Sequence, residues 1–499
     1  MNFYKNIKMT LGILAIVSLV SSCDDGFDEL NVNPNASPVI LSDMLLAYTQ
    51  NGIAAHRYEA WRSNLLHAAT NANHMMTPWS TPYATNEGWN PAYWDRMYVR
   101  EVSNIKECIS IIDNNSELSD ATKLGKKSIA RIWKVFIFHR ITDFWGDVPY
   151  SEAGLGHTAD GTVTPAYDTQ ESIYADMLNE LAEAVGDLSP GGNSFGANDI
   201  LYGGDHDSWI AFGNSLRLRL GMRLTNANAT LAQSNVEAAV AGSLISSNAG
   251  TARVPFYSAS NDDQWSAESN GSSAPIQAFT GSFMTADFIN VLVDNADPRL
   301  PVYALPTSGT VNNGNYMGVP NGAPATPITP AIGVDYSLPN NTTVFAIDAD
   351  AVLLGYPEVL FLLAEAAERG WNVSGAGTAQ ELYEQGISAS LQYHNVDDGG
   401  TYSAGANVVF NTGGSTEDRL DQIATQKWLA LFGDEYESWA DLRRAKGSAG
   451  LDWFTQVNGA IPERLDYPVT EQTLNGDQYT AAVARQGADN EATKIYWSK

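Results

Sequence analysis

The sequence has 499 residues, with 57 acidic and 28 basic side chains and a formal net charge of −29 at pH 7. A field of this sign repels nucleic acids and anionic lipid surfaces, so neither is expected to bind the folded protein. Apolar residues form 44% of the chain and aromatic residues 10%, which is enough to build a sizeable core.

Residues 1–22 predict a lipoprotein leader. Lys5 and Lys8 precede the apolar run 11–20, which is too short to span a membrane comfortably. The sequence Ser-Ser-Cys that follows resembles a bacterial lipobox, so we expect cleavage before Cys23 and attachment of a diacylglycerol to its thiol. The alternative is an ordinary secretion signal with an incidental cysteine. No other apolar run approaches membrane length, so the sequence predicts an anchor of lipid on Cys23.

The segment Ser119–Ala153 predicts the helix around which the rest of the core forms. Its apolar residues recur at the three-and-four spacing of one helical face. They are Ile129, Ile132, Trp133, Phe136, Ile137, Ile141 and Phe144. Ser119 is a suitable N-cap, and Gly146 and Pro149 stop the helix. A helix with such a face must be buried against other helices.

Apolar residues at the same spacing predict further helices along most of the chain. The predicted ranges are 41–76, 92–113, 169–187, 205–225, 230–245, 279–293, 356–371, 378–393 and 417–445. Cys108 falls on one of them, and we expect it to be a buried free thiol. The tail after Gly459 is expected to be irregular, with Tyr496 and Trp497 docked on the body.

Several segments of the chain resemble one protein family. Residues 141–153, ITDFWGDVPYSEA, are similar to the DxxGDxPYSEA motif of the SusD/RagB family of outer-membrane nutrient-binding lipoproteins. The other similar segments are FDELNVNPNASP, WIAFGNSLRLRLGMRL, YPEVLFLLAEAAERGW, QKWLALFGDEYESWADLRRA and the tail beginning PERLDYPVTEQ, which resembles the end of a SusD-like subgroup. Together they cover most of the chain in family order.

The resemblance implies a mostly α-helical fold, in which tetratricopeptide-like helix pairs form the scaffold and long irregular loops form the ligand-binding side. It implies a lipidated tether over 23–40 and a single SusD-like domain over 41–499, with a loop-rich insertion on the ligand side at 254–345. It also implies a cell-surface position on the outer membrane, where the protein captures oligosaccharide or polysaccharide and delivers it to a SusC-like TonB-dependent transporter.

Aromatic residues in loop-like segments are candidates for a sugar-binding platform, because a sugar ring stacks its apolar face on an aromatic side chain. Four candidates lie in a Pro- and Gly-containing segment that cannot be helical, and two lie in segments rich in Asn, Ser and Gly. The candidate residues are Trp79, Tyr83, Asn86 and Trp89 in the first segment, and Trp265 and Tyr316 in the others. The alternative is that these aromatics pack the loops onto the helices.

Charge favours a neutral ligand. Between residues 254 and 345 there is one basic residue, Arg299, against seven acidic ones, and an anionic polysaccharide needs Arg or Lys to pair with. The seven are Asp262, Asp263, Glu268, Asp287, Asp294, Asp297 and Asp335. A neutral glucan, mannan or xylan therefore fits this region better.

The sequence contains no protease, nucleotide-binding or hydrolase motif, so we expect no catalytic residues and no cofactor. Two alternatives stay open, which are a peptide-binding member of the same family and a helical glycoside hydrolase. The acid clusters at 262–263, 397–398 and 434–437 could hold structural calcium, although plain solvated charge is the alternative and none resembles an EF-hand loop. Arg443 and Arg444 are expected in buried ion pairs that fix the last helices.

Overall fold

The computed structural model describes residues 41–55, 61–76, 90–156, 158, 161–257, 269–273, 276, 282–309, 314–321, 335–373, 375–445 and 461–499. The chain divides into two units, Met1–Leu41 and Ser42–Lys499, and the fold below is that of the second. This unit is mostly α-helical, which confirms the predicted fold class.

Most of the elements are helices of two to seven turns. The α-helices are α3 (Ser42–Ala55), α5 (Ala69–Asn71), α6 (Asn90–Arg96), α7 (Ser103–Asn114), α8 (Asp120–Trp145), α9 (Gln170–Asp187), α10 (His206–Arg223), α11 (Ala229–Val240), α13 (Ala286–Asp294), α14 (Leu300–Tyr303), α16 (Tyr356–Glu368), α17 (Ala379–Tyr393), α18 (Thr416–Ala430), α19 (Glu435–Ala445), α20 (Val469–Leu474) and α21 (Gly476–Gln486). Two π-helical segments are η1 (Trp61–Ala68) and η2 (Met97–Val102). Three short 3₁₀ turns are η3 (Gly196–Asn198), η4 (Asn248–Gly250) and η7 (Tyr496–Ser498).

Six short strands form three antiparallel pairs in the described part of the chain. They are β1 (Met75–Met76) with β5 (Phe283–Met284), β2 (Val148–Pro149) with β3 (Tyr167–Asp168), and β4 (Ala252–Val254) with β6 (Ala351–Leu354). Each pair joins two segments that lie between helices. The strands therefore connect loops to each other and do not form a separate sheet layer.

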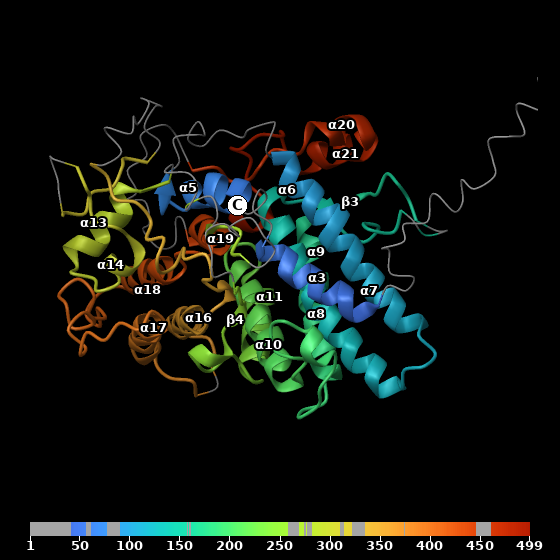
Figure 1. The fold of residues 1–499 in the computed structure, drawn as a ribbon, viewed down its shortest axis with the longest axis horizontal. Helices are drawn as coiled ribbons and strands as arrows, with labels where there is room; N and C mark the ends of the chain where they lie inside the picture. The colour runs from blue at the N-terminus through green and yellow to red at the C-terminus, as the bar shows by residue number, and fades with distance from the viewer. Residues whose placement is uncertain are drawn as a thin grey trace, which may run out of the picture. The chain divides into compact units, whose positions relative to one another are not determined.

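The long helices pack in succession, each on the next, as shown in Figure 1. Helix α7 lies against α3 and α8, α8 against α9, and α9 against α10. Helix α10 then packs on α11 and α16, and α16 on α17 and α18. Successive helix pairs of this kind form the tetratricopeptide-like scaffold that the sequence predicted.

Helix α8 occupies the centre of this packing. Ser119 caps it, because its hydroxyl accepts a hydrogen bond from the Thr122 N–H at 3.2 Å. Gly146 ends it with a φ of +83°, which glycine adopts readily. Every residue from Val135 to Trp145 is buried, so the C-terminal half of α8 is enclosed on all sides and not only along its apolar face. The polar side chains on this half therefore need partners inside the core.

Four predicted helices differ from the observed ones. The described residues of the range 41–76 form α3, the π-helical η1 and the short α5, and the range ends in strand β1 and not in a helix. The range 417–445 is two helices, because the chain turns between α18 and α19 at Gly433, whose φ is +105°. The range 92–113 begins earlier and contains the π-helical η2 between α6 and α7. In the range 279–293 the chain forms β5 first, and α13 starts only at Ala286, after the cap provided by Thr285.

The prediction of an irregular tail was wrong. Residues after 461 include α20 and α21, of which only Ala482 is buried. These helices lie on the surface, and their apolar contact with the core is limited to Ala482 and the half-buried Tyr479 and Val483 of α21, so the periodicity that identifies core helices is short. The docking of the last residues was correct, since Trp497 is fully buried and its indole N–H donates to Asp143 Oδ1 at 3.0 Å. Cys108 is a buried free thiol, as expected.

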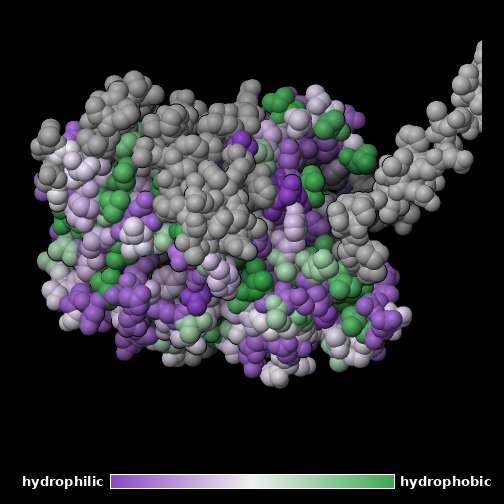
Figure 2. Space-filling model, viewed as in Figure 1, coloured by the Kyte–Doolittle hydropathy of each residue, from purple (hydrophilic) through white to green (hydrophobic). Residues whose placement is uncertain are grey.

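The surface of this unit is polar with scattered apolar residues. Figure 2 shows hydrophilic residues gathered where α16 and α17 lie in Figure 1. Large exposed apolar side chains such as Val99, Val163 and Leu474 come from separate parts of the chain. Within the described ranges, no helix has the length and apolar character that crossing a membrane would require.

Candidate functional site

The structure does not test most of the predicted ligand residues. Trp79, Tyr83, Asn86, Trp89 and Trp265 lie outside the described residues, as does Cys23. Tyr316 is described. It is half-buried and packs partly against the hydrophobic core, which is the alternative role considered for all of these aromatics.

A strand at the start of one predicted segment pairs with a strand of the loop-rich insertion. Strand β1 ends at Met76, directly before the segment with Trp79 and Trp89, and β5 begins at Phe283, beyond the described stretch 269–273 that follows the segment with Trp265. The two strands pair antiparallel, with Met76 opposite Phe283. A two-residue ladder thus joins stretches of chain that are more than two hundred residues apart in sequence.

A third segment of the loop-rich insertion joins them through Val319. The Val319 N–H donates to the Met284 carbonyl, and the Val319 carbonyl accepts from the Ala286 N–H, both at 2.8 Å. Met76, Phe283 and Val319 form a small buried cluster against which Tyr336 and Leu338 pack, and we call these five residues the loop-root cluster. Residues 77–89, 277–281 and 322–334 each begin or end within a few residues of this cluster.

The loop-root cluster is held to the helical body by buried polar contacts. The Thr285 N–H donates to the His74 carbonyl, and the Asn321 amide donates to the Thr70 carbonyl and to Asn73. His74 Nδ1 lies 2.6 Å from Glu435 Oε2 at the start of α19, and both side chains are fully buried. The start of the segment with Trp79 and Trp89 and two segments of the loop-rich insertion are therefore fixed next to rigid elements, which is the usual way that a scaffold positions a binding loop.

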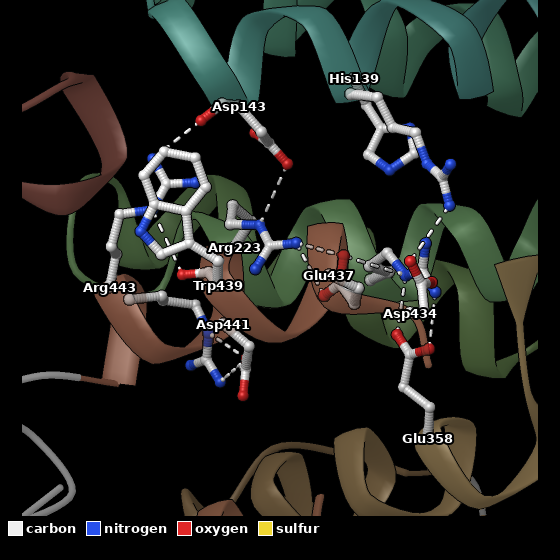
Figure 3. Close-up of polar contacts among 12 residues, drawn as sticks. His139, Asp143, Arg223, Glu358, Asp434, Glu437, Trp439, Asp441 and Arg443 are labelled. Atoms are coloured by element: carbon white, nitrogen blue, oxygen red, sulfur yellow. Dashed lines mark hydrogen bonds and ion pairs between the residues drawn. The ribbon is translucent and has the colours of Figure 1, made fainter. Parts of the chain in front are cut away.

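A network of buried charges joins four helices of the core, as Figure 3 shows. Both oxygens of Glu437 on α19 accept from Arg223 of α10, at 2.6 and 2.7 Å, and Arg223 Nε lies 3.6 Å from Asp143 Oδ2 of α8. Arg219 of α10 donates to both oxygens of Glu358 on α16, at 2.7 and 2.6 Å. These five side chains are at most 6% exposed, so their main role is to join helices.

A second buried set fixes α18 and α19. Arg444 donates to both oxygens of Glu365 at 2.7 Å and to Asp441 at 2.8 Å, and Lys427 donates to Asp441 at 2.7 Å. Burial by itself raises the pKa of Glu365, but Arg444, Arg369 and Lys427 outweigh it and lower the pKa to about 2. Arg444 forms the predicted ion pairs, whereas the Arg443 guanidinium donates to the carbonyls of Asp143 and Glu463.

The acid clusters that were candidates for calcium have other partners where they are described. Asp434, Glu435 and Glu437 contact Arg140, His74 and Arg223, respectively. The carboxylates at 397–398 accept backbone N–H groups of the following turn. Among the described residues, no three His, Cys, Asp or Glu side chains are grouped so as to hold a metal ion. Residues 262–263 lie outside the described part of the chain.

The loop-root cluster was not foreseen from the sequence. Its strands are two residues long, which is too short for an alternation of apolar and polar residues to be recognised. The buried Asn73, His74 and Asn321 look like ordinary loop residues in the sequence. Only the Thr285 cap before an apolar helix offers a local signal.

Comparisons with known proteins agree on one family. The model of the SusD-like family described as "Starch-binding associating with outer membrane" matches residues 34–468. No curated protein sequence matches the chain significantly.

Solved structures of the same kind match almost end to end. A chitin-binding protein matches with a TM-score of 0.78 and 27% identity, covering 92% of this chain and 99% of that one. A chitin-binding SusD homologue from Flavobacterium johnsoniae matches with a TM-score of 0.76 and 26% identity, over 92% and 98% of the two chains. A SusD homologue from Bacteroides uniformis gives 0.78 and 25%, over 92% and 99%. The chain therefore belongs to the SusD-like family of starch-binding proteins that associate with the outer membrane.

Proposed function

We propose that this protein is a lipid-anchored, cell-surface glycan-binding protein that captures a neutral oligosaccharide or polysaccharide and delivers it to a SusC-like TonB-dependent transporter. Family membership supports a role in glycan capture at the outer membrane, and two of the similar structures are described as chitin-binding. No catalytic residues and no cofactor are part of this proposal.

The observation that carries the proposal is the loop-root cluster. It holds the start of the segment with Trp79, Tyr83, Asn86 and Trp89, all candidates for sugar contacts, against two segments of the loop-rich insertion, which also contains Trp265. We propose that the aromatic faces and amide groups of these segments supply the apolar floor and the few polar groups that a sugar site needs. Tyr316 lies three residues before Val319 of the cluster.

The burial and pairing of Arg299 support a neutral ligand. Its guanidinium is fully buried, pairs with Asp297 at 2.7 Å, and also donates to Ser390, Tyr402 and Gln426. The one basic side chain between residues 254 and 345 is thus enclosed and bound within the protein, and it is not available to an anionic polysaccharide.

Calorimetry with a panel of ligands tests the proposal. We expect binding to at least one neutral glucan, mannan, xylan or chitin oligosaccharide, and no binding to sulfated or uronic-acid chains of similar length. The panel includes mixed peptides, because a peptide-binding member of the same family would prefer them. New reducing ends in the same mixtures would reveal a glycoside hydrolase, and their appearance would contradict the proposal.

A further inference from the structure

A cavity of about 710 Å³ lies away from the loop-root cluster, none of whose five residues lines it. It is enclosed by β4 and β6, by the ends of α16 and α17, and by the turn between α18 and α19. Its volume is within the roughly 300–1,000 Å³ that small-molecule sites occupy. Nothing in the proposed capture of glycan by the aromatic segments uses this cavity.

The wall of the cavity is partly aromatic. Phe345 and Phe432 are 1% and 5% exposed and line it together with Tyr393. Arg253 and Asp350, which pair at 3.2 Å, are the more exposed charged residues of the lining. This combination of flat apolar faces with polar groups at an edge is typical of sites for amphipathic small molecules.

Two hydrogen-bond acceptors in the lining have no donor. Asp434 is 5% exposed, and its Oδ1 accepts from Arg140 at 3.1 Å while its buried Oδ2 has no partner. The Asn248 amide donates to the Ala389 carbonyl, and its buried Oδ1 has no partner either. Buried polar atoms are nearly always hydrogen-bonded, so these two favour a ligand that brings donors.

The charges of the lining disfavour an anion. Asp350, Glu358 and Asp434 are acidic and Arg253 is the one basic lining residue, while Arg219 and Arg140 neutralise Glu358 and Asp434 from inside the core. Each of these carboxylates is paired with an arginine, and no free cation is among the described lining residues, so an anionic ligand would find no partner. A ligand with hydroxyl groups offers donors without adding a charge.

We propose that this cavity is a second ligand site, for a neutral polyhydroxylated molecule of one or two sugar rings. Hydroxyl groups of the ligand donate to Asp434 Oδ2 and Asn248 Oδ1, and its apolar C–H face lies against Phe345, Phe432 and Tyr393. The site requires neither the aromatic segments nor a transporter, so its failure and that of the proposed glycan capture can be told apart.

Calorimetry on the purified protein tests the second site with glucose, xylose and cellobiose as neutral probes, choline as a cationic probe and glucuronate as an anionic one. We expect at least one neutral sugar to bind. Ala351→Phe places a ring in the cavity and should abolish this binding. Asp434→Asn replaces the free acceptor by a donor and should weaken binding about tenfold. Trp79→Ala should leave this binding unchanged.

The matched control is Asp147→Asn. Asp147 is also a buried carboxylate paired with an arginine, Arg485 at 2.8 Å, but it does not line the cavity. If Asp434→Asn fails to fold, Ala351→Phe decides the question. The proposal is overturned if no neutral sugar binds at about 10 mM, if binding persists in folded Ala351→Phe, or if choline or glucuronate binds in place of the sugars.

Discussion

Arg299 and Glu358 are charged residues whose roles depend on the side chains that surround them in the fold. In the sequence Arg299 is the one cation of the loop-rich insertion, and in the structure it is completely enclosed by its partners. Glu358 is an ordinary acidic residue of a helical segment in the sequence, and in the structure it is 3% exposed and bound by Arg219 on both oxygens. Both residues are held by partners inside the protein, so neither is free to pair with a charged ligand.

Replacing Trp265 or Trp79 by alanine should weaken glycan binding about tenfold, because each indole removes one stacking face for a sugar ring. The melting temperature should stay nearly unchanged if these rings contact the ligand and not the core. Calorimetry and thermal denaturation measure the two effects. The control is Tyr48→Ala, an aromatic residue on α3 that is 41% exposed. A large drop in melting temperature with unchanged binding would show that the rings only pack the loops.

Glu358→Gln should change stability in a pH-dependent way. Burial, assisted by Glu437, raises the pKa of Glu358 to about 7 against the pull of Arg219. As pH falls, the folded state therefore takes up a proton at about 7, and the unfolded state takes one up only at about 4.5. The free energy of unfolding rises as pH falls through this interval, and this gain is lost as pH rises through 7. Glutamine cannot titrate. The wild type should gain on the order of 3 kcal/mol relative to Glu358→Gln over this range.

Urea unfolding of both proteins at pH 7.5 and pH 5 measures this difference. Burial lowers the pKa of His67 to about 4 and that of His394 to about 3, so both take up a proton in this pH range only when the protein unfolds. Both proteins share these histidines, so their contributions cancel in the comparison. Glu384→Gln, at an exposed position of α17, is the matched surface control. A constant difference between wild type and Glu358→Gln at the two pH values would contradict the assignment.

At the scale of elements, the end of α8 is a point where several segments meet. Gly146 has a positive φ, and a Cβ there would collide with the side chain of Gln486. Gln486 at the end of α21 joins this point by accepting from the Asp147 N–H at 2.6 Å and donating to the Trp145 carbonyl at 3.0 Å. The conformation of one glycine thus decides whether α21 can attach to α8.

Gly146→Ala should lower the free energy of unfolding by about 1–3 kcal/mol, because alanine is strained at this φ and displaces Gln486. Thermal and urea denaturation measure the loss. Gly186→Ala, in α9, is the matched control, since open space surrounds the added methyl group. That control should be neutral or slightly stabilising. Equal stability of the two variants would mean that the end of α8 tolerates a side chain.

The sequence predicted core helices well and surface elements poorly, for a physical reason. Helix α8 was predicted at its observed bounds because its apolar residues repeat and its cap and stop residues are distinct. Helices α20 and α21 were missed because they bury almost nothing. The turn at Gly433 lies inside a segment that reads as one amphipathic helix.

For the candidate site, composition pointed to the aromatic segments, but the sequence could not show that the start of the first segment pairs with the loop-rich insertion. The pairing of Met76 with Phe283 depends on two residues in each strand and on contacts across the whole chain. No local pattern encodes such a register. The contacts of Trp79, Trp265 and the other candidates with a ligand stay a prediction.

At the scale of the whole molecule, membrane attachment is assigned to a single thiol. Cys23→Ala should release the protein into the soluble fraction, because acyl chains supply the proposed attachment. Fractionation of cells in high salt, in a strain that lacks the transporter, measures this. Cys108→Ala is the control, since its buried thiol is on α7 in the core. Retention of Cys23→Ala in the outer membrane under these conditions would refute the anchor.

The proposed partnership predicts a stable complex. Gentle solubilisation of membranes should yield this protein together with a much larger SusC-like transporter, because a lid that delivers ligand must dock over a large surface. Affinity purification followed by size-exclusion chromatography measures this. Free lipoprotein alone, from cells shown to express the transporter, would contradict the delivery role.

The contact between Trp497 and Asp143 joins residues 354 positions apart, and it lies in the middle of the core. In a solenoid of independent repeats, a partial chain can fold as it emerges, because each repeat contacts only its neighbours. Here a contact at the centre of the molecule requires residues at the end of the chain, and contacts of such long sequence separation form slowly. A secretion channel that threads an unfolded polypeptide would therefore have more time to export the chain before it folds. We expect truncation before Trp497 to leave a chain that is exported but degraded by proteases.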